Sequence, residues 1–345
     1  MHLLVIRFSA MGDVALTAPV VHSLLERNPA LKITFVSNKA FEPFFNRSDR
    51  FSFHPAELKT KHKGAGGLFE LFKELKTQPF DAVVDLHDVL RSRILCTYFK
   101  GQGKRIIRFN KGRSEKKKLL KPDCDFKPLP HTTARYFEAF QSLGLSIGMT
   151  DDPWKKPKSS GELNEFFTAN RLSPEAKLIG IAPFALHESK IWGSDKIDAL
   201  IGKLKEKGLD NILLFGGRNE IDRLQRLQEN HPEVVIVAGQ LELNQELELM
   251  TMLRVMVSMD SSNMHLMSIL GKKVVSIWGG THHFLGFGPL GNEGLIVEVP
   301  RETLPCRPCT IYGKTDSQKQ RDCAKAAMDG ITVDQVLEKI RKVLL

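Results

Sequence analysis

Short apolar runs alternate with amphipathic stretches along most of the chain. The apolar runs predict strands at 1–8, 32–37, 80–86 and 105–109, and then at 178–182, 211–215, 234–238, 255–259 and 274–278. Helical periodicity fills the intervals, at 14–27, 68–76, 89–99 and 132–143, and then at 196–207, 220–230, 245–254, 264–270 and 333–345. Strands that alternate with helices predict parallel sheets covered on both faces. We therefore expect an α/β protein with two doubly wound units.

The boundary between the two units is predicted at a polar, proline-broken stretch, residues 151–161. A chain of 345 residues is long enough for two domains of ordinary size. We place the domains at 1–158 and 159–345, with a final helix that could pack back on the first domain. The glycines at 64–67 predict a mobile loop before a helix.

The composition excludes several classes of protein. No run of eighteen apolar residues occurs, so no transmembrane helix is expected, and the apolar stretch before Arg7 is too short for a signal peptide. A cytoplasmic location follows, in which the five cysteines would be reduced. Cys306, Cys309 and Cys323 could provide three ligands for zinc, but reduced structural thiols are the simpler interpretation.

The net charge of +10 is unevenly placed. Residues 1–172 hold 29 Lys and Arg against 18 Asp and Glu, a net of +11, which leaves −1 for the remainder. Nine of the eighteen residues at 104–121 are basic. Such a block is often a solvated loop, but an excess confined to one half favours an anionic partner: a phosphorylated lipid or sugar, or a membrane surface. Aromatic residues do not interleave with the run, so nucleic acid is disfavoured.

A candidate catalytic carboxylate follows the first strand, in the turn Ser9-Ala10-Met11-Gly12-Asp13. In open α/β sheets, ligands bind at the edge where strands end and helices begin. This turn is not G-x-G-x-x-G, which argues against an NAD-type first domain. Asp13 could instead be only an N-cap.

A second turn of similar kind, Asp260-Ser261-Ser262-Asn263-Met264-His265, follows the strand at 255–259. A helix N-terminus with small hydroxyl residues suits an anion, although Ser261 or Ser262 could simply cap the helix. Further polar groups follow other strands of the second half: Lys190, which could neutralise a diphosphate; Gly216, Gly217 and Glu220, which suit a nucleotide; and Thr281 with His282 and His283, the last two a weak metal signal.

Taken in order, these residues resemble glycosyltransferase family 9, the heptosyltransferases of lipopolysaccharide core assembly. The resemblance extends from residue 1 to about residue 340. Its motifs are Arg7-Phe8-Ser9-Ala10-Met11-Gly12-Asp13-Val14 with Thr17 and Pro19, Lys190 with Trp192, Gly216-Gly217, Asp260-Ser261 with Met264-His265-Leu266, Gly279 with Thr281, and Gly286-Phe287-Gly288-Pro289.

The resemblance implies a GT-B architecture, in which two Rossmann-like domains face a central cleft. It implies that Asp13 is the general base of an inverting transfer, and that donor contacts come from Lys190, Glu220, Asp260, Ser261 and His265; we add Gly216, Gly217, Ser262 and Thr281 to this donor set. The nucleotide-sugar would be ADP-heptose, bound by the C-terminal domain, and the acceptor a phosphorylated lipopolysaccharide precursor. Three places depart from the family pattern. Ser262-Asn263 stands where the family often has Gly-Pro, Gly279-Gly280-Thr281 stands where it usually has Gly-Pro-Thr, and His282-His283-Phe284 follows where a proline is common.

Acceptor binding is assigned to basic residues of the first half: Arg91, Arg93, Lys116, Lys117 and Lys118. No cofactor and no metal are expected, because the D-x-D letters at 123–125 lie in a basic, proline-bearing loop. We expect a monomer, peripheral on the inner face of the inner membrane. The alternatives are another GT-B enzyme, such as a nucleotide-sugar epimerase, and a non-enzymatic protein that binds anionic glycolipid.

Overall fold

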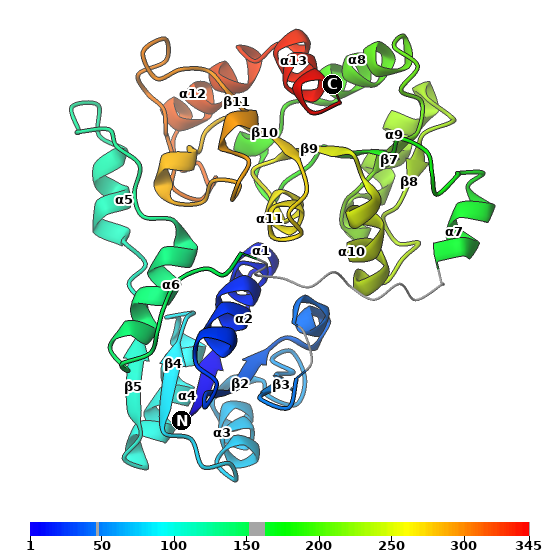
Figure 1. Cartoon of the computed structure of the whole chain (residues 1–345). Helices are drawn as coiled ribbons and strands as arrows, with labels where there is room; N and C mark the ends of the chain where they lie inside the picture. Colours follow the sequence, from blue (N-terminus) through cyan, green and yellow to red (C-terminus); the bar gives the residue numbers. More distant parts are fainter. Residues whose placement is uncertain (46–47, 152–162, 345) are drawn as a thin grey trace. The chain divides into compact units, whose positions relative to one another are not determined.

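The computed structural model describes residues 1–45, 48–151 and 163–344 and divides into two compact units (Figure 1). The first comprises Met1–Gly112 and Pro130–Lys155, and the second comprises Arg113–Leu129 and Lys156–Leu345. The linker expected at 151–161 lies, apart from Asp151, outside the described residues. The segment Arg113–Leu129, which the sequence analysis places in the first domain, clusters with the second unit.

The first unit is built on a parallel sheet with the strand order β3-β2-β1-β4-β5. The order reverses between β1 and β4, whose ends are in register at Ile6 and Asp85. The strands are β1 (His2–Ile6), β2 (Lys32–Ser37), β3 (Phe51–Pro55), β4 (Ala82–Asp85) and β5 (Arg105–Arg108). The helices are α1 (Met11–Ala15), α2 (Thr17–Arg27), η1 (Lys39–Phe44), α3 (Gly64–Leu75), α4 (Leu90–Gly101) and α6 (Thr132–Gln141).

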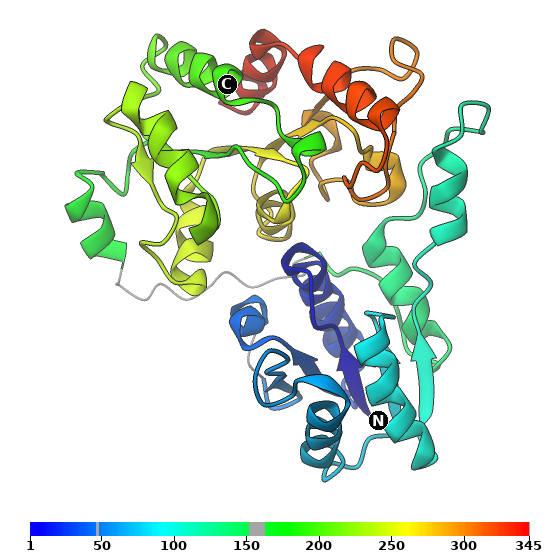
Figure 2. The ribbon, with the colours of Figure 1, turned by 180° about the vertical axis from the view of Figure 1, so that it is seen from behind.

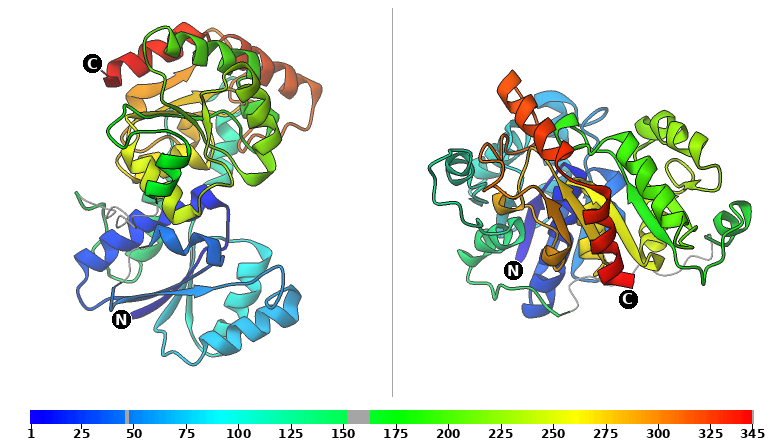
Figure 3. Two further views of the ribbon diagram at one scale, coloured as in Figure 1. Left: turned by 90° about the vertical axis from the view of Figure 1, so that its right-hand side faces the viewer. Right: turned by 90° about the horizontal axis from the view of Figure 1, so that it is seen from above.

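Helices cover both faces of this sheet. Helices α3 and α4 pack on one face, where Phe72 and Phe99 bury their rings against Leu4 and Val83, and α2 lies on the other (Figures 2 and 3). The glycines at 64–67 form the first turn of α3, so the loop expected there is wrong. The helix expected at 14–27 is two helices. Pro19 has no N–H to donate to the Ala15 carbonyl oxygen, so the helix is interrupted just before the proline, between α1 and α2.

The second unit has a parallel sheet with the order β11-β10-β9-β6-β7-β8, and its order reverses between β6 and β9. The strands are β6 (Ile179–Ala182), β7 (Ile212–Leu214), β8 (Val235–Ile236), β9 (Val255–Met259), β10 (Val274–Trp278) and β11 (Ile296–Glu298). The helices are α5 (Arg113–Leu119), α7 (Leu163–Ala169), η2 (Glu188–Lys190), α8 (Ser194–Lys205), η3 (Arg218–Glu220), α9 (Ile221–Asn230), α10 (Leu243–Met252), α11 (Ser262–Ile269), η4 (His283–Leu285), η5 (Glu293–Leu295), α12 (Gln318–Asp329) and α13 (Val333–Leu344).

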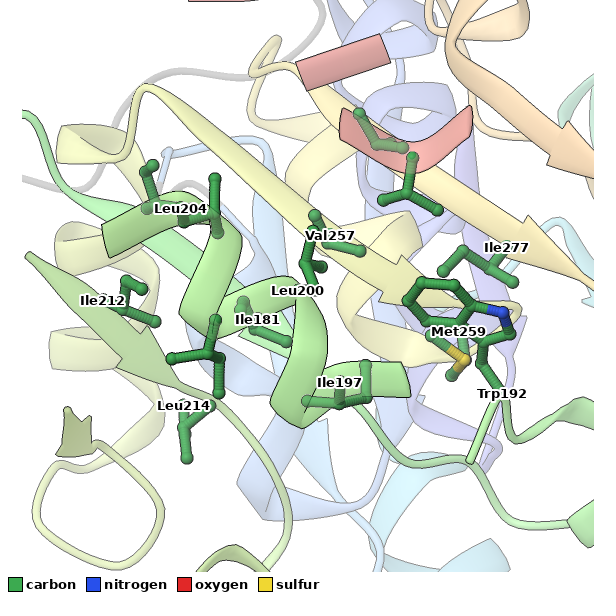
Figure 4. Packing of buried hydrophobic residues seen from close by; sticks show 14 of the residues in the cluster. Ile181, Trp192, Ile197, Leu200, Leu204, Ile212, Leu214, Val257, Met259 and Ile277 are labelled. Carbon is green, nitrogen blue, oxygen red and sulfur yellow. The ribbon is translucent and has the colours of Figure 1, made fainter. Parts of the chain in front are cut away.

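The largest core of the second unit lies between this sheet and α8, α9 and α13. Leu200 and Leu204 of α8 face Ile181 and Val257 of the strands, and Trp192 closes the cluster near Met259 (Figure 4). The apolar stripe of α13 is used here, since it contacts α8, β9, β10 and β11. Helix α13 therefore belongs to the core of the second unit.

Both sheets follow the strand order of the Rossmann fold, which confirms the predicted fold class of two doubly wound α/β units. Within the described residues, no helix is long and apolar enough to cross a bilayer.

Candidate active site

The first candidate site lies at the carboxyl edge of the first sheet, after β1. Helix α1 begins with Ala10 as its N-cap, so Asp13 stands in the first turn and does not cap the helix. Its carboxylate forms an ion pair with Arg7, whose side chain is buried, while the Asp13 side chain is 33% exposed. Gly12, also in this turn, is buried. The turn thus presents a partly exposed carboxylate whose partner is fixed inside the protein.

Arg7 is held from several sides. Its Nη1 donates to the Leu86 carbonyl oxygen at 2.5 Å, and its guanidinium carbon lies 5.9 Å from the ring centroids of both Phe109 and Tyr136. Burial opposes the charge of Arg7, but Asp13, Tyr136 and Asp85 together outweigh burial and raise the pKa of the guanidinium above its ordinary value. The Tyr136 hydroxyl donates to the Asp13 carbonyl oxygen at 3.3 Å. These contacts orient the carboxylate at the point where the strand order reverses.

The second candidate site lies at the carboxyl edge of the second sheet and brings together three predicted donor residues. Lys190 follows β6, Asp260 follows β9 and Thr281 follows β10. Lys190 Nζ lies 2.7 Å from Asp260 Oδ2, and the Thr281 hydroxyl donates to the same oxygen at 2.7 Å. The Lys190 and Asp260 side chains are only 15% and 7% exposed. As in the first unit, the cluster sits where the strand order reverses, which is the usual ligand position in such sheets.

The remaining donor candidates line the same edge. Ser261 is the N-cap of α11, yet its hydroxyl pairs with that of Ser258 at 3.1 Å and makes no capping bond. Ser262 begins the helix, and His265 is buried one turn further on. After β7, Glu220 accepts the N–H of Gly217 at 2.7 Å, which closes a tight turn.

The family comparison gives a clear result. The model of glycosyltransferase family 9 (heptosyltransferase) matches residues 68–325. This chain belongs to glycosyltransferase family 9. The lipopolysaccharide heptosyltransferase 1 of Escherichia coli strain K12 is 24% identical over 322 residues, covering 88% of this chain and 95% of the relative.

Solved structures of family 9 share the fold. The glycosyl transferase family 9 protein from Veillonella parvula superimposes with a TM-score of 0.75 at 17% identity, covering 99% of this chain and 97% of that one. The E. coli ADP-heptose lipopolysaccharide heptosyltransferase II superimposes with a TM-score of 0.70 at 20% identity, covering 100% and 98%. The match to the family 9 model, together with the curated relative, makes the activity class that of a glycosyltransferase.

Gly280 explains one departure from the family 9 pattern. Its N–H donates to the Ser189 carbonyl oxygen at 2.9 Å, a bond that proline could not make, and its own carbonyl accepts the N–H of Cys309 at 2.9 Å. A Cβ here would lie 3.0 Å from that of Ala324. Glycine at this position therefore lets the turn after β10 pack closely against the segments that carry Ser189, Cys309 and Ala324.

Arg307 is a functional candidate that the sequence analysis missed. It is 1% exposed, and its guanidinium donates to the carbonyl oxygens of Gly279, Thr281 and Val299 and to the Glu298 carboxylate. Burial lowers the pKa of Arg307, while Glu298 opposes this. The side chain thus fixes the backbone of the turn that carries Thr281. Its only sequence signal is its place between Cys306 and Pro308.

The cysteine expectation is wrong for one pair. Cys306 and Cys323 form a disulfide, with Cα atoms 6.2 Å apart, so they are not reduced thiols and do not leave three ligands for zinc. Cys309 is free and buried, and burial raises the pKa of its thiol to about 11.

In the described part of the chain, one group could hold a metal ion: His282, His283 and Glu298, with ligand atoms within 4.8 Å of one another. The Glu298 carboxylate already pairs with Arg307 at 3.1 Å. Burial, opposed by Glu298, lowers the pKa of His282 to about 3. A cation entering here would compete with the guanidinium for the same carboxylate.

The predicted acceptor residues fall into two groups. Arg91 and Arg93 are exposed on α4 in the first unit, where Arg93 pairs with Asp88 at 2.7 Å. Lys116, Lys117 and Lys118 belong to the second unit. Lys116 is buried, with Nζ 4.0 Å from the ring centroid of Phe287, whereas its two neighbours are exposed. The Lys116 side chain therefore packs against an aromatic ring of the second unit, whereas Lys117 and Lys118 are open to solvent.

Proposed function

We propose that this glycosyltransferase moves a heptose from ADP-heptose to a phosphorylated acceptor of the lipopolysaccharide inner core, with inversion at the anomeric carbon and without a metal ion. Its similarity to lipopolysaccharide heptosyltransferase 1 and to the ADP-heptose lipopolysaccharide heptosyltransferase II of E. coli supports the sugar, the nucleotide and the pathway. The excess positive charge of residues 1–172 supports an anionic acceptor and a peripheral position at the membrane surface. We further propose that the enzyme acts as a monomer at the inner face of the inner membrane.

In the proposed reaction, Asp13 is the general base. The pKa of a sugar hydroxyl lies far above neutrality, so a carboxylate must accept its proton as the new bond forms. The hydroxyl attacks the anomeric carbon from the side opposite the nucleotide. The bond from that carbon to the diphosphate oxygen breaks, and the leaving group departs with its electron pair.

Lys190 and the N-terminus of α11 would stabilise the leaving diphosphate. Charge that develops on a leaving group is stabilised best by donors already in position, and Lys190 is fixed by Asp260. Glu220 would bind ribose hydroxyls beside Gly216 and Gly217, and Asp260, Ser261, Ser262, His265 and Thr281 would complete the donor pocket. The observation that carries the proposal is that each unit collects its polar side chains at the reversal point of its own sheet.

The test is Asp13→Asn. Transfer should fall by about 10²–10⁴-fold, which is the usual contribution of a general base. Binding of ADP should be unchanged, because the donor residues belong to the other unit. The control is Asp81→Asn, which alters an exposed carboxylate that accepts the N–H of His2. Full turnover by Asp13→Asn would refute the assigned base.

The identity of the nucleotide donor and the independence from metal are tested by a separate measurement. A ligand that binds only the folded state raises its apparent stability. We expect ADP and ADP-heptose to raise the melting temperature, with EDTA making no difference. Stabilisation by UDP or GDP compounds alone would reassign the donor, and loss of the effect in EDTA would refute metal independence.

A further inference from the structure

His87 occupies a position in the first unit that the proposed reaction does not yet use. It follows β4, and its ring lies edge-on to that of Phe8, which follows β1, with centroids 5.8 Å apart. Arg7, the partner of Asp13, donates to the carbonyl oxygen of Leu86, the residue before His87. His87 and the proposed base therefore share the edge at which the strand order of this sheet reverses.

The backbone that carries His87 is rigidly held. The fully buried carboxylate of Asp85 accepts the N–H groups of His87 and Asp88, both at 2.9 Å, and the Ser92 hydroxyl at 3.0 Å. Asp88 adopts a φ of 48°, which is uncommon for a residue other than glycine. A loop fixed in this way determines where the imidazole lies before any ligand arrives.

The imidazole of His87 has a buried nitrogen whose hydrogen-bonding capacity no described residue uses. His87 is 6% exposed, and within the described residues its Nδ1 is buried without a hydrogen-bond partner. Burial, together with the charges of Arg7 and Lys111, lowers the pKa of His87 to about 3, so the ring is neutral at physiological pH. A buried polar atom without a partner lowers the stability of the folded protein. A phenyl ring in the same place would avoid this cost.

We propose that His87 is a hydrogen-bonding contact to the acceptor sugar and determines which hydroxyl is presented to Asp13. This proposal rests on the proposed function, in which the first unit holds the acceptor. A neutral imidazole can donate from one nitrogen and accept at the other, which suits a sugar hydroxyl. Lys111 and Arg91, which act on His87 electrostatically, favour an acceptor that carries an anionic group near that hydroxyl.

Three substitutions test the role of the ring. His87→Phe removes both nitrogens, His87→Asn places an amide near the position of Nδ1, and His87→Gln places one near the position of Nε2. We expect His87→Phe to raise the acceptor KM by about tenfold or more. The donor KM should not change, and the melting temperature should stay equal or rise. One of the two amides should restore the acceptor KM and so identify the nitrogen that makes the contact.

The matched control is His2→Phe, at the opposite end of β1. Its Nε2 has a partner, the Thr34 hydroxyl, at 2.9 Å. This change should lower the melting temperature and leave the acceptor KM unaltered. If His87→Phe behaves like His2→Phe, or if it leaves the acceptor KM unchanged, the proposal is overturned.

Acceptor binding to Asp13→Asn protein, with and without His87→Phe, separates this proposal from the assignment of the base. Calorimetry with a lipopolysaccharide precursor needs no turnover. Weaker binding only when His87 is replaced supports the contact, whatever Asp13 does. Equal binding by both proteins overturns the role of His87 even if Asp13 proves to be the base.

Discussion

Asp260 Oδ2 lies 2.7 Å from Lys190 Nζ and accepts the Thr281 hydroxyl at the same distance. One carboxylate oxygen therefore joins the loops that follow β6, β9 and β10, which are three adjacent strands. In the proposed reaction, this arrangement positions the cation before a diphosphate binds, so little reorganisation would be needed when charge develops on the leaving group.

Replacing Lys190 with methionine should reduce ADP affinity and transfer by about 10²–10³-fold, the usual cost of losing one preorganised charge donor. Titration calorimetry with ADP measures the first effect and initial rates the second. Lys203→Met removes the lysine of a more exposed pair with Asp334 in the same unit and should change neither. ADP affinity that survives in Lys190→Met would exclude the diphosphate role.

Arg7 should affect the rate more than substrate binding. Arg7→Lys keeps the charge but cannot reproduce the guanidinium contacts with Asp13 and Leu86 together. We expect kcat to fall in Arg7→Lys and to fall further in Arg7→Met, with the donor KM unchanged. The melting temperature of both variants shows whether the loss is one of folding. A rate that matches the wild type in a folded Arg7→Met protein would contradict this role.

Arg307 should couple stability to nucleotide binding. Breaking a buried ion pair by removing one partner typically costs about 3–5 kcal/mol. Arg307→Met also removes the guanidinium donor from four carbonyl oxygens, those of Trp278, Gly279, Thr281 and Val299. We predict a lower melting temperature and weaker ADP binding at temperatures where the variant is folded. Unaltered ADP affinity would mean that the turn carrying Thr281 does not need this support.

The raised pKa of Glu246 should make the stability of the protein depend on pH. Burial, reinforced by Glu242, raises the pKa of Glu246 from 4.5 to about 7. Between these values the folded protein binds more protons than the unfolded chain, so this group makes the protein less stable as the pH rises through that window. Glu246→Gln should therefore match the wild type near pH 4.5 and melt higher above pH 7. A difference in melting temperature between Glu246→Gln and the wild type that stays the same at every pH would contradict the prediction.

The three adjacent lysines should give different results. Lys116→Met removes a buried cation from the face of Phe287 and should lower the melting temperature, since a desolvated cation–π contact contributes about 2 kcal/mol. Lys117→Met and Lys118→Met should leave stability unchanged and weaken acceptor binding mainly at low salt. Acceptor titrations at two ionic strengths separate the two effects.

The sequence predicted most of the central strands because buried parallel strands are continuous apolar runs. Edge strands β3 and β11 were missed: the first alternates polar with apolar residues and ends in Pro55, and the second has three residues. The positions of Asp13, Lys190, Asp260 and Thr281 at the carboxyl edges of the sheets were predicted because each residue follows a strand, and the end of a strand can be recognised locally in the sequence.

Residues whose importance comes from distant partners could not be found in this way. Arg307 acts on a turn 26 to 29 positions away. His87 is notable only because, among the residues that the structure describes, none is a hydrogen-bond partner for its buried Nδ1. The burial of Lys116 depends on Phe287, and the pairing of Cys306 with Cys323 depends on the loop between them. None of these relationships produces a periodicity or a residue spacing that could be recognised in the sequence before the fold is known.

The chain passes from the first unit to the second at residue 112, returns at 130 and leaves again after 155. The second unit is therefore formed by two separate segments of the sequence, and no single truncation point yields the complete unit. A fragment that starts at residue 156 would lack α5, whose Lys116 covers Phe287, and Leu129, whose N–H donates to the Phe284 carbonyl oxygen at 2.9 Å. A chimaera that exchanges the second unit between family members must therefore include residues 113–129, since without them Phe287 and Phe284 lose these contacts.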